Sequence, residues 1–177
     1  MDTNHNGHDM KKLILPLLAV VFAVSSCGVL TGETHAEKAA REAREARMVV
    51  ENLQSGNFRI DIDRMYPLRG SSQHVNNYSV TVKDGMIDSH LPFIGQAWRV
   101  PYGGGHALNF KDKILGYNVS QTRKDGYEVR IYVKTDEDEH LYLFTIFDNG
   151  RASLDVQSGN RDRCSYSGLM DFYYTGE

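Results

Sequence analysis

The most unusual group of residues with chemical potential is the segment Pro101-Tyr102-Gly103-Gly104-Gly105-His106, which follows Trp98 closely. Glycines let a backbone approach a ligand or take a positive φ, and aromatic rings beside them can contact that ligand. A phosphate-binding loop is excluded, because no Gly-Lys-Ser or Gly-Lys-Thr follows and no helix is expected after the glycines. We predict that the ligand-contacting residues are Trp98, Tyr102, Gly103, Gly104, Gly105 and His106. The alternative is a flexible or bulged crossover between strands.

A second group, Asp136-Glu137-Asp138-Glu139-His140, places four carboxylates beside an imidazole. Carboxylate oxygens attract calcium, but an EF-hand-type loop needs Asp or Asn at alternate positions and a central glycine, and this run contains no glycine. We interpret the run as a solvated acidic loop between two strands. The sequence therefore predicts no metal site and no cofactor.

Two further groups could support catalysis, the pair Asp61 and Asp63 and the thiol of Cys164. Residues two apart on a strand share a face, and apolar residues alternate with the two aspartates. We therefore interpret the aspartates as part of the solvent-exposed face of a strand. Cys164 would need a nearby histidine to lower its pKa, and no motif supplies one. Because Gly-x-Ser-x-Gly and His-Glu-x-x-His motifs are also missing, we expect no enzymatic activity. The alternative is an unrecognised hydrolase with its nucleophile and base near Gly103 to His106.

The N-terminal region has the pattern of an export signal. Lys11-Lys12 precedes an apolar run from Leu13 to Val24, and the small residues Ser25-Ser26 then lead to Cys27. The run is shorter than the ~20 residues that a membrane-spanning helix needs, and Pro16 interrupts it. We predict a signal peptide over residues 1–26, with Met10 as an alternative start to Met1.

Val24-Ser25-Ser26-Cys27 resembles the bacterial lipobox, in which the cysteine is acylated and the chain is cleaved before it. Acyl chains contribute ~0.8 kcal/mol per buried methylene, so several of them would anchor the chain permanently to a membrane. Gly28, in place of an aspartate, is similar to lipoproteins sent to the outer membrane, and residues 28–32 carry no acidic run. We expect a cell-envelope lipoprotein on the outer membrane, facing the periplasm. An ordinary secretory signal with a coincidental cysteine is the alternative.

Length, composition and charge fit one ordinary globular domain. The chain has 177 residues, of which 41% are hydrophobic and 24% charged, and these fractions are typical of a folded domain. The net charge is −3 and the sequence has no basic block, so the chain lacks the clustered positive charge that binds phosphate backbones. We therefore expect no nucleic-acid partner.

A helix is predicted over residues 34–55, after a tether over residues 27–33. Thr34-His35-Ala36-Glu37 has the form of a capping box, and Gly56 is placed to end the helix. Its apolar stripe consists mainly of alanines, which bury little surface, so we interpret its first turns as a solvated spacer. A partner-binding helix or coiled coil is the alternative.

From residue 57 to residue 174 the apolar period changes from helical to two, which is typical of strands with one buried face. Asp84-Gly85, Asp125-Gly126 and Asn149-Gly150 predict hairpins, because both central residues of a type I′ turn need positive φ. The expected fold is mainly β, an antiparallel β-sandwich or partly closed barrel with one N-terminal α-helix.

The β region resembles a family of exported lipoproteins from Bacteroides-type bacteria, the domain of unknown function 4251. The residues that carry the resemblance are Phe58, Ile60, Asn77-Tyr78-Ser79-Val80-Thr81-Val82, Leu91-Pro92-Phe93-Ile94-Gly95-Gln96-Ala97, Pro101-Tyr102-Gly103-Gly104-Gly105, Tyr117-Asn118-Val119, Phe147-Asp148-Asn149-Gly150-Arg151-Ala152 and Ser165-Tyr166-Ser167-Gly168. The resemblance implies a β-rich envelope lipoprotein. It transfers no catalytic residue, because the family has no assigned function.

The predicted export signal and the predicted fold together favour a non-catalytic binding or scaffold module, held to the membrane through its N-terminal lipid. The expected partner is an envelope protein or a glycan. The alternative is a carrier that encloses a small apolar ligand in a β-barrel, which would need a cavity lined by inward residues of several strands.

We predict that Cys27→Ala abolishes incorporation of labelled palmitate and leaves the signal peptide uncleaved, because the acyl acceptor is lost. Metabolic labelling followed by immunoprecipitation from a bacterial host measures both effects. Cys164→Ala is the matched control and should keep the label. Equal labelling of Cys27→Ala and the natural chain would contradict the anchor.

Overall fold

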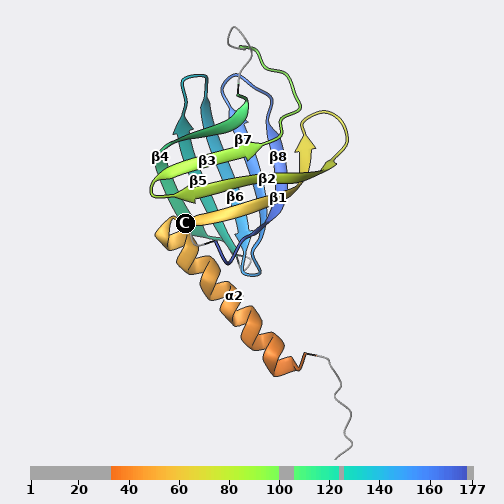
Figure 1. The fold of residues 1–177 in the computed structure, drawn as a ribbon, viewed down its shortest axis with the longest axis vertical. Helices are drawn as coiled ribbons and strands as arrows, with labels where there is room; N and C mark the ends of the chain where they lie inside the picture. Colours follow the sequence, from red (N-terminus) through yellow and green to blue (C-terminus); the bar gives the residue numbers. More distant parts are fainter. Residues whose placement is uncertain (1–32, 100–105, 124–125, 175–177) are drawn as a thin grey trace, which may run out of the picture. The chain divides into compact units, whose positions relative to one another are not determined.

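The computed structural model describes residues 33–99, 106–123 and 126–174. Eight strands form one closed antiparallel barrel in chain order, preceded by helix α2 (Figure 1). The elements are α2 (His35–Ser55), β1 (Phe58–Pro67), β2 (Gln73–Lys83), β3 (Met86–Leu91), β4 (Leu108–Gln121), β5 (Gly126–Lys134), β6 (Glu139–Phe147), β7 (Arg151–Ser158) and β8 (Cys164–Met170). Within these residues, the predicted mainly β fold with one helix is confirmed. Of the two predicted architectures the structure is the barrel, and it is fully closed because β8 pairs with β1.

Helix α2 ends as its sequence indicates. Gly56 has a φ of 68°, its N–H bonds to the Leu53 carbonyl at 3.3 Å, and the Asn57 N–H bonds to the Asn52 carbonyl at 3.2 Å. This pair of bonds is the Schellman motif, which satisfies the last carbonyls of a helix. Residues 35–44 are exposed, whereas Val49 and Leu53 are buried. No helix in the described part of the chain combines the length and apolarity that a membrane crossing requires.

The last turns of α2 pack against the end of the barrel where β1 begins. Val49 and Leu53 join the hydrophobic core of the barrel. The Tyr117 hydroxyl of β4 donates to the Leu53 carbonyl at 2.7 Å, and the Asn52 amide lies 3.7 Å from the Met170 sulfur of β8. These contacts tie the helix to strands on two sides of the barrel.

Large side chains fill the barrel interior. Phe58 and Phe144 meet edge to face at 5.8 Å between ring centroids, and the Tyr142 hydroxyl is 2.8 Å from the Ser89 hydroxyl. The Tyr166 hydroxyl donates to the Pro92 carbonyl at 2.7 Å, so both buried tyrosines satisfy their polar atoms. A water-sized internal cavity would leave such side chains accessible, yet each is at most 2% exposed. This packing gives no support to the carrier alternative.

Two predicted hairpin turns lie within the described residues, and their geometries differ. Asp84 and Gly85 have φ values of 52° and 73°, as a type I′ turn requires. At the second turn Gly150 has a φ of 76°, but Asn149 has no positive φ, and the Gly150 N–H bonds to the Phe147 carbonyl at 2.8 Å. The type I′ prediction is wrong there, because a three-residue loop places only the glycine in the left-handed region. Asp125 lies outside the described residues, although β4 and β5 pair as a hairpin would.

We predict that Gly168→Ala destabilises the fold, because the closing strands approach too closely for a side chain. A Cβ at Gly168 would lie 2.1 Å from the Asp61 carbonyl oxygen. Overpacking costs about 1–3 kcal/mol and more when backbone must move, so we expect at least about 2 kcal/mol in chemical unfolding. At the control position Gly116 the nearest atom would be the Tyr132 Cβ at 3.6 Å, an ordinary contact. Equal losses for Gly168→Ala and Gly116→Ala would contradict the close approach.

Candidate functional site

Four connections between strands leave the barrel at the end opposite to α2, because successive strands are antiparallel. We use the name rim for the described residues of three of them, the β3–β4, β5–β6 and β7–β8 connections. These residues are 92–99, 106–107, 135–138 and 159–163. The rim contains Trp98 and His106 of the predicted ligand-contacting group. Tyr102, Gly103, Gly104 and Gly105 lie outside the described residues, as does Cys27.

Arg161 is the buried centre of the rim. It is 7% exposed, its Nη2 donates to Glu137 Oε2 at 2.9 Å, and its Nε lies 3.9 Å from Asp138 Oδ2. The guanidinium carbon lies 6.0 Å from the centre of the Phe93 ring, a cation–π distance. A buried guanidinium needs such partners, because desolvation of an isolated charge is very costly.

Asp138 corrects the prediction of a solvated acidic loop. Its side chain is buried and accepts hydrogen bonds from the Glu139 N–H at 2.8 Å, the Asn160 N–H at 3.1 Å and the Asn160 Nδ2 at 3.3 Å. His140 is buried as well. The carboxylate tolerates burial because these donors and Arg161 replace water. Asp138 therefore joins the β5–β6 and β7–β8 connections.

The same network fixes the backbone that carries Trp98. The Trp98 N–H donates to the Asn160 carbonyl at 2.8 Å, and Ala97 forms an isolated bridge with Arg161. The Gln96 N–H donates to Asp162 Oδ2 at 3.0 Å, and the Asp162 N–H returns a bond to the Gln96 carbonyl at 2.9 Å. Yet the Trp98 side chain is 65% exposed. A large aromatic side chain is thus displayed on an ordered backbone.

His106 is connected to Arg161 through Glu137. Its N–H donates to Glu137 Oε1 at 3.1 Å, while Glu137 Oε2 accepts from Arg161. The His106 side chain is exposed. Trp98 and His106 therefore belong to one hydrogen-bonded assembly, although eight positions separate them in the sequence.

A polar hollow of about 340 Å³ lies in the rim, beside the backbone contact of Trp98. Its lining comprises Lys134, Thr135, Asp136, Glu137, Asp138, Glu139, Gly159 and Asn160. The lining offers carboxylate acceptors and ammonium and amide donors, a set that can bind a ligand rich in hydroxyl groups. Among the described residues, no cluster of three or more His, Cys, Asp or Glu side chains could hold a metal ion.

The other chemical candidates do not line the rim hollow. Asp61 and Asp63 are exposed on β1, as predicted, where Asp61 pairs with Arg59 Nε at 2.7 Å and Asp63 accepts from the Ser167 hydroxyl at 2.9 Å. Cys164 is a buried free thiol, and burial raises its pKa. A raised pKa keeps a thiol protonated and weakens it as a nucleophile.

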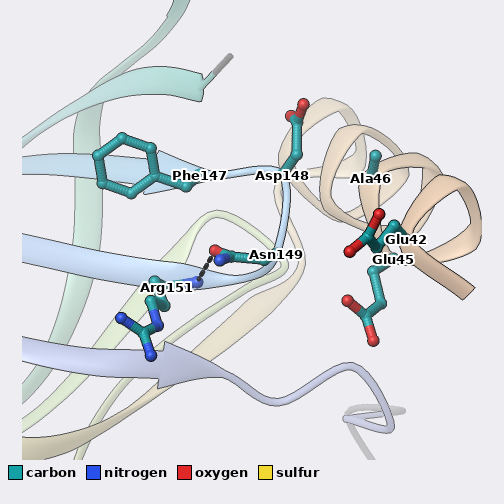
Figure 2. Close-up of a pocket in the computed structure, with 7 residues that line it drawn as sticks. All are labelled: Glu42, Glu45, Ala46, Phe147, Asp148, Asn149 and Arg151. Atoms are coloured by element: carbon teal, nitrogen blue, oxygen red, sulfur yellow. Dashed lines mark hydrogen bonds between the residues drawn. The ribbon is translucent and has the colours of Figure 1, made fainter. Parts of the chain in front are cut away.

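A larger hollow of about 430 Å³ lies between α2 and the β6–β7 turn (Figure 2). It is lined by Glu42, Glu45, Ala46, Phe147, Asp148, Asn149 and Arg151. In Figure 2 the Phe147 ring points away from the helix. Cations of the same helix already balance the charges of both glutamates, since Lys38 lies 3.8 Å from Glu42 and Arg41 lies 3.0 Å from Glu45. Lys134 and Glu139 of the rim hollow are paired in the same way, at 2.8 Å, but the rim also displays the exposed Trp98 on an ordered backbone. We therefore favour the rim as the functional site.

Arg161, Asn160 and Asp162 organise the rim, but they were not among the site residues predicted from the sequence. The available signal was the polar run Asn160-Arg161-Asp162-Arg163, which lies between β7 and β8. Its partner Glu137 lies 24 positions earlier, so only the three-dimensional pairing shows its role.

Comparisons with known proteins agree with this architecture. The family model described as a domain of unknown function, DUF4251, matches residues 40–170. A similar solved structure is the crystal structure of a DUF4251 family protein from Bacteroides eggerthii DSM 20697, with a TM-score of 0.57 and 14% identity. The alignment covers 74% of this chain and 89% of that one, and at this identity it supports the fold alone. A search of curated proteins finds no match.

We predict that His140 makes the fold less stable as the pH falls from 7 to 5. Burial lowers the pKa of His140 below its ordinary value of 6.5, against the opposing effect of Asp138. The unfolded chain then binds a proton that the folded chain resists, so stability is lost as the pH falls below 6.5. Urea unfolding at both pH values measures the change.

The matched variant His140→Gln removes the titrating group at the same buried position. Its unfolding free energy should decrease less over this pH range than that of the natural chain. Identical pH dependence in both proteins would contradict the role of His140.

Proposed function

Because the chain belongs to the DUF4251 family, whose description assigns no function, we propose a function from the site itself. The protein is a lipid-anchored component of the cell envelope, and its barrel is a non-catalytic binding module that holds a ligand at the rim. The observation that carries this proposal is Trp98, which is 65% exposed on a backbone fixed by the Arg161 network.

An exposed tryptophan on a fixed backbone is suited to binding. Tryptophan provides a large contact area and is enriched among residues that dominate binding energy. The rim loses little conformational freedom when a ligand binds, because hydrogen bonds to Asn160 and Asp162 already order residues 96–98.

An envelope glycan is the ligand class that we favour. Ring faces of sugars can stack on the indole, and their hydroxyl groups can bond to polar groups of the 340 Å³ hollow, whose lining residue Asn160 accepts the Trp98 N–H. An envelope protein is the second candidate, supported by the same exposed indole.

The proposed anchor is Cys27, and the proposed location is the outer membrane, facing the periplasm. The lipobox-like residues before Cys27 and the glycine after it support this location. Helix α2 follows this region in the chain and enters the barrel at the end opposite to the rim. The rim would then be at the end of the barrel that is not joined to the anchored segment, where ligands can reach it.

We predict that Trp98→Ala weakens glycan binding at least tenfold, the range in which buried aromatic contacts act. Isothermal titration with peptidoglycan fragments and with outer-membrane polysaccharide measures the affinity. Because the chain has one tryptophan, quenching of its emission by the same probes reports contact at Trp98 in the natural protein.

The matched control is Tyr173→Ala, which removes an aromatic side chain that is 83% exposed outside the rim. It should leave the affinity unchanged. Equal loss in both variants, or binding of no glycan by the natural protein, would contradict a glycan site at the rim.

A further inference from the structure

Strand β4 changes partner along its length. Its first part, Leu108 to Lys113, pairs with β3, whereas Ile114 to Gln121 pairs with β5. The bond from the Ile114 N–H to the Gly85 carbonyl, at 2.8 Å, is the last backbone bond towards the β2–β3 hairpin. Within the described residues, positions 115–121 therefore have a strand neighbour on one side. We call their other side the free edge.

Apart from a β-bulge at its start, between Ile114 and Gly116, the free edge lacks the protection that sheet edges usually carry. Exposed edges are normally guarded by charged residues, proline or strong irregularity, because their unpaired backbone groups accept another strand. The first part of β4, which β5 leaves uncovered, carries Lys111, Asp112 and Lys113. The free edge reads Leu115-Gly116-Tyr117-Asn118-Val119-Ser120-Gln121 and contains no charge and no proline.

Strand β2 also has a stretch with a strand neighbour on one side only. Residues 73–78 of β2 pair with β1 and extend beyond β3. Asn77 interrupts this stretch with a φ of 63°, which bends the strand and makes it a poor template. The free edge has a β-bulge between Ile114 and Gly116, but no positive φ occurs between residues 115 and 121, and Gly116 to Gln121 pair with β5 without interruption.

Open space lies beside the start of the free edge. A hollow of about 360 Å³ separates Ser55-Gly56-Asn57 from Ile114, Leu115, Gly116 and Tyr117. Leu115 is 57% exposed there, and Asn118, Ser120 and Gln121 are exposed further along the strand. The C-terminal end of α2 therefore does not fill this space.

We propose that the free edge pairs with the free edge of a second copy, giving a two-fold dimer with a continuous sheet across the interface. The two edges meet antiparallel about Asn118, so that Tyr117 of each copy lies opposite Val119 of the other. An aromatic side chain opposite a β-branched one is a favourable cross-strand pair. The absence of charge lets identical edges meet without repulsion, and a two-fold interface satisfies both sets of backbone groups.

The oligomeric state of the full chain in mild detergent tests this proposal. Analytical ultracentrifugation from 1 to 100 µM should show a dimer for the natural protein. Ser120→Lys should give a monomer, because each interface would gain two charges, and Glu128 opposite Ser120 on β5 lets the folded monomer accept the lysine. A natural protein that stays monomeric over this range would overturn the proposal.

Ser153→Lys is the matched control. Ser153 is an exposed serine in β7, where strands cover both edges. This variant should remain a dimer. If both lysine variants dissociate, or if neither does, the dimer does not use the free edge. Circular dichroism and the unfolding midpoint show whether each variant retains the fold.

A cysteine at the two-fold axis tests the register. Asn118→Cys should form an intermolecular disulfide under mild oxidation, because only pairing about Asn118 places the two residues directly opposite each other, at about 4.5–5.5 Å between Cα atoms. Ser153→Cys and the natural chain are the controls for background crosslinking. Crosslinking of Asn118→Cys no greater than in these controls would overturn the register.

Discussion

The pairing of β8 with β1 is the constraint on which the rest of this structure depends. It leaves no open sheet edge between β8 and β1, so the eight strands enclose one interior. All inward side chains must therefore fit within one limited volume. At the crossing, the strands approach so closely that Gly168 lies against the Asp61 backbone. The interior is then filled by aromatic residues whose hydroxyls find partners within the barrel, Tyr142 with Ser89 and Tyr166 with Pro92.

Closure leaves two open ends, and the chain covers them by different means. At one end, Val49 and Leu53 of α2 add apolar surface to the core. At the other, the buried ion pairs of Arg161 with Glu137 and Asp138 join loops from separate hairpins. Hydrophobic contact tolerates small shifts, whereas a buried charge network requires specific geometry. The rim is accordingly the end at which hydrogen bonds and ion pairs fix side-chain positions, which supports the binding role that we propose for it.

The sequence predicted most of the elements because their signals are local. The period of two after residue 57 predicted a region of strands, and Asp84-Gly85 predicted a turn with its correct geometry. Barrel and sandwich could not be separated, because a period of two is the same in both. Burial of Asp138 was missed because it depends on Arg161, from another hairpin, as a non-local partner.

The placement of α2 and the rim at opposite ends has a mechanical consequence. A force applied between the helix and a ligand at the rim would act along the strands, nearly parallel to them apart from their tilt in the barrel. Hydrogen bonds in antiparallel ladders run across the strands, so such a load shears many of them together instead of opening them one at a time. The barrel would therefore resist extension in this direction far better than peeling of a single terminal strand.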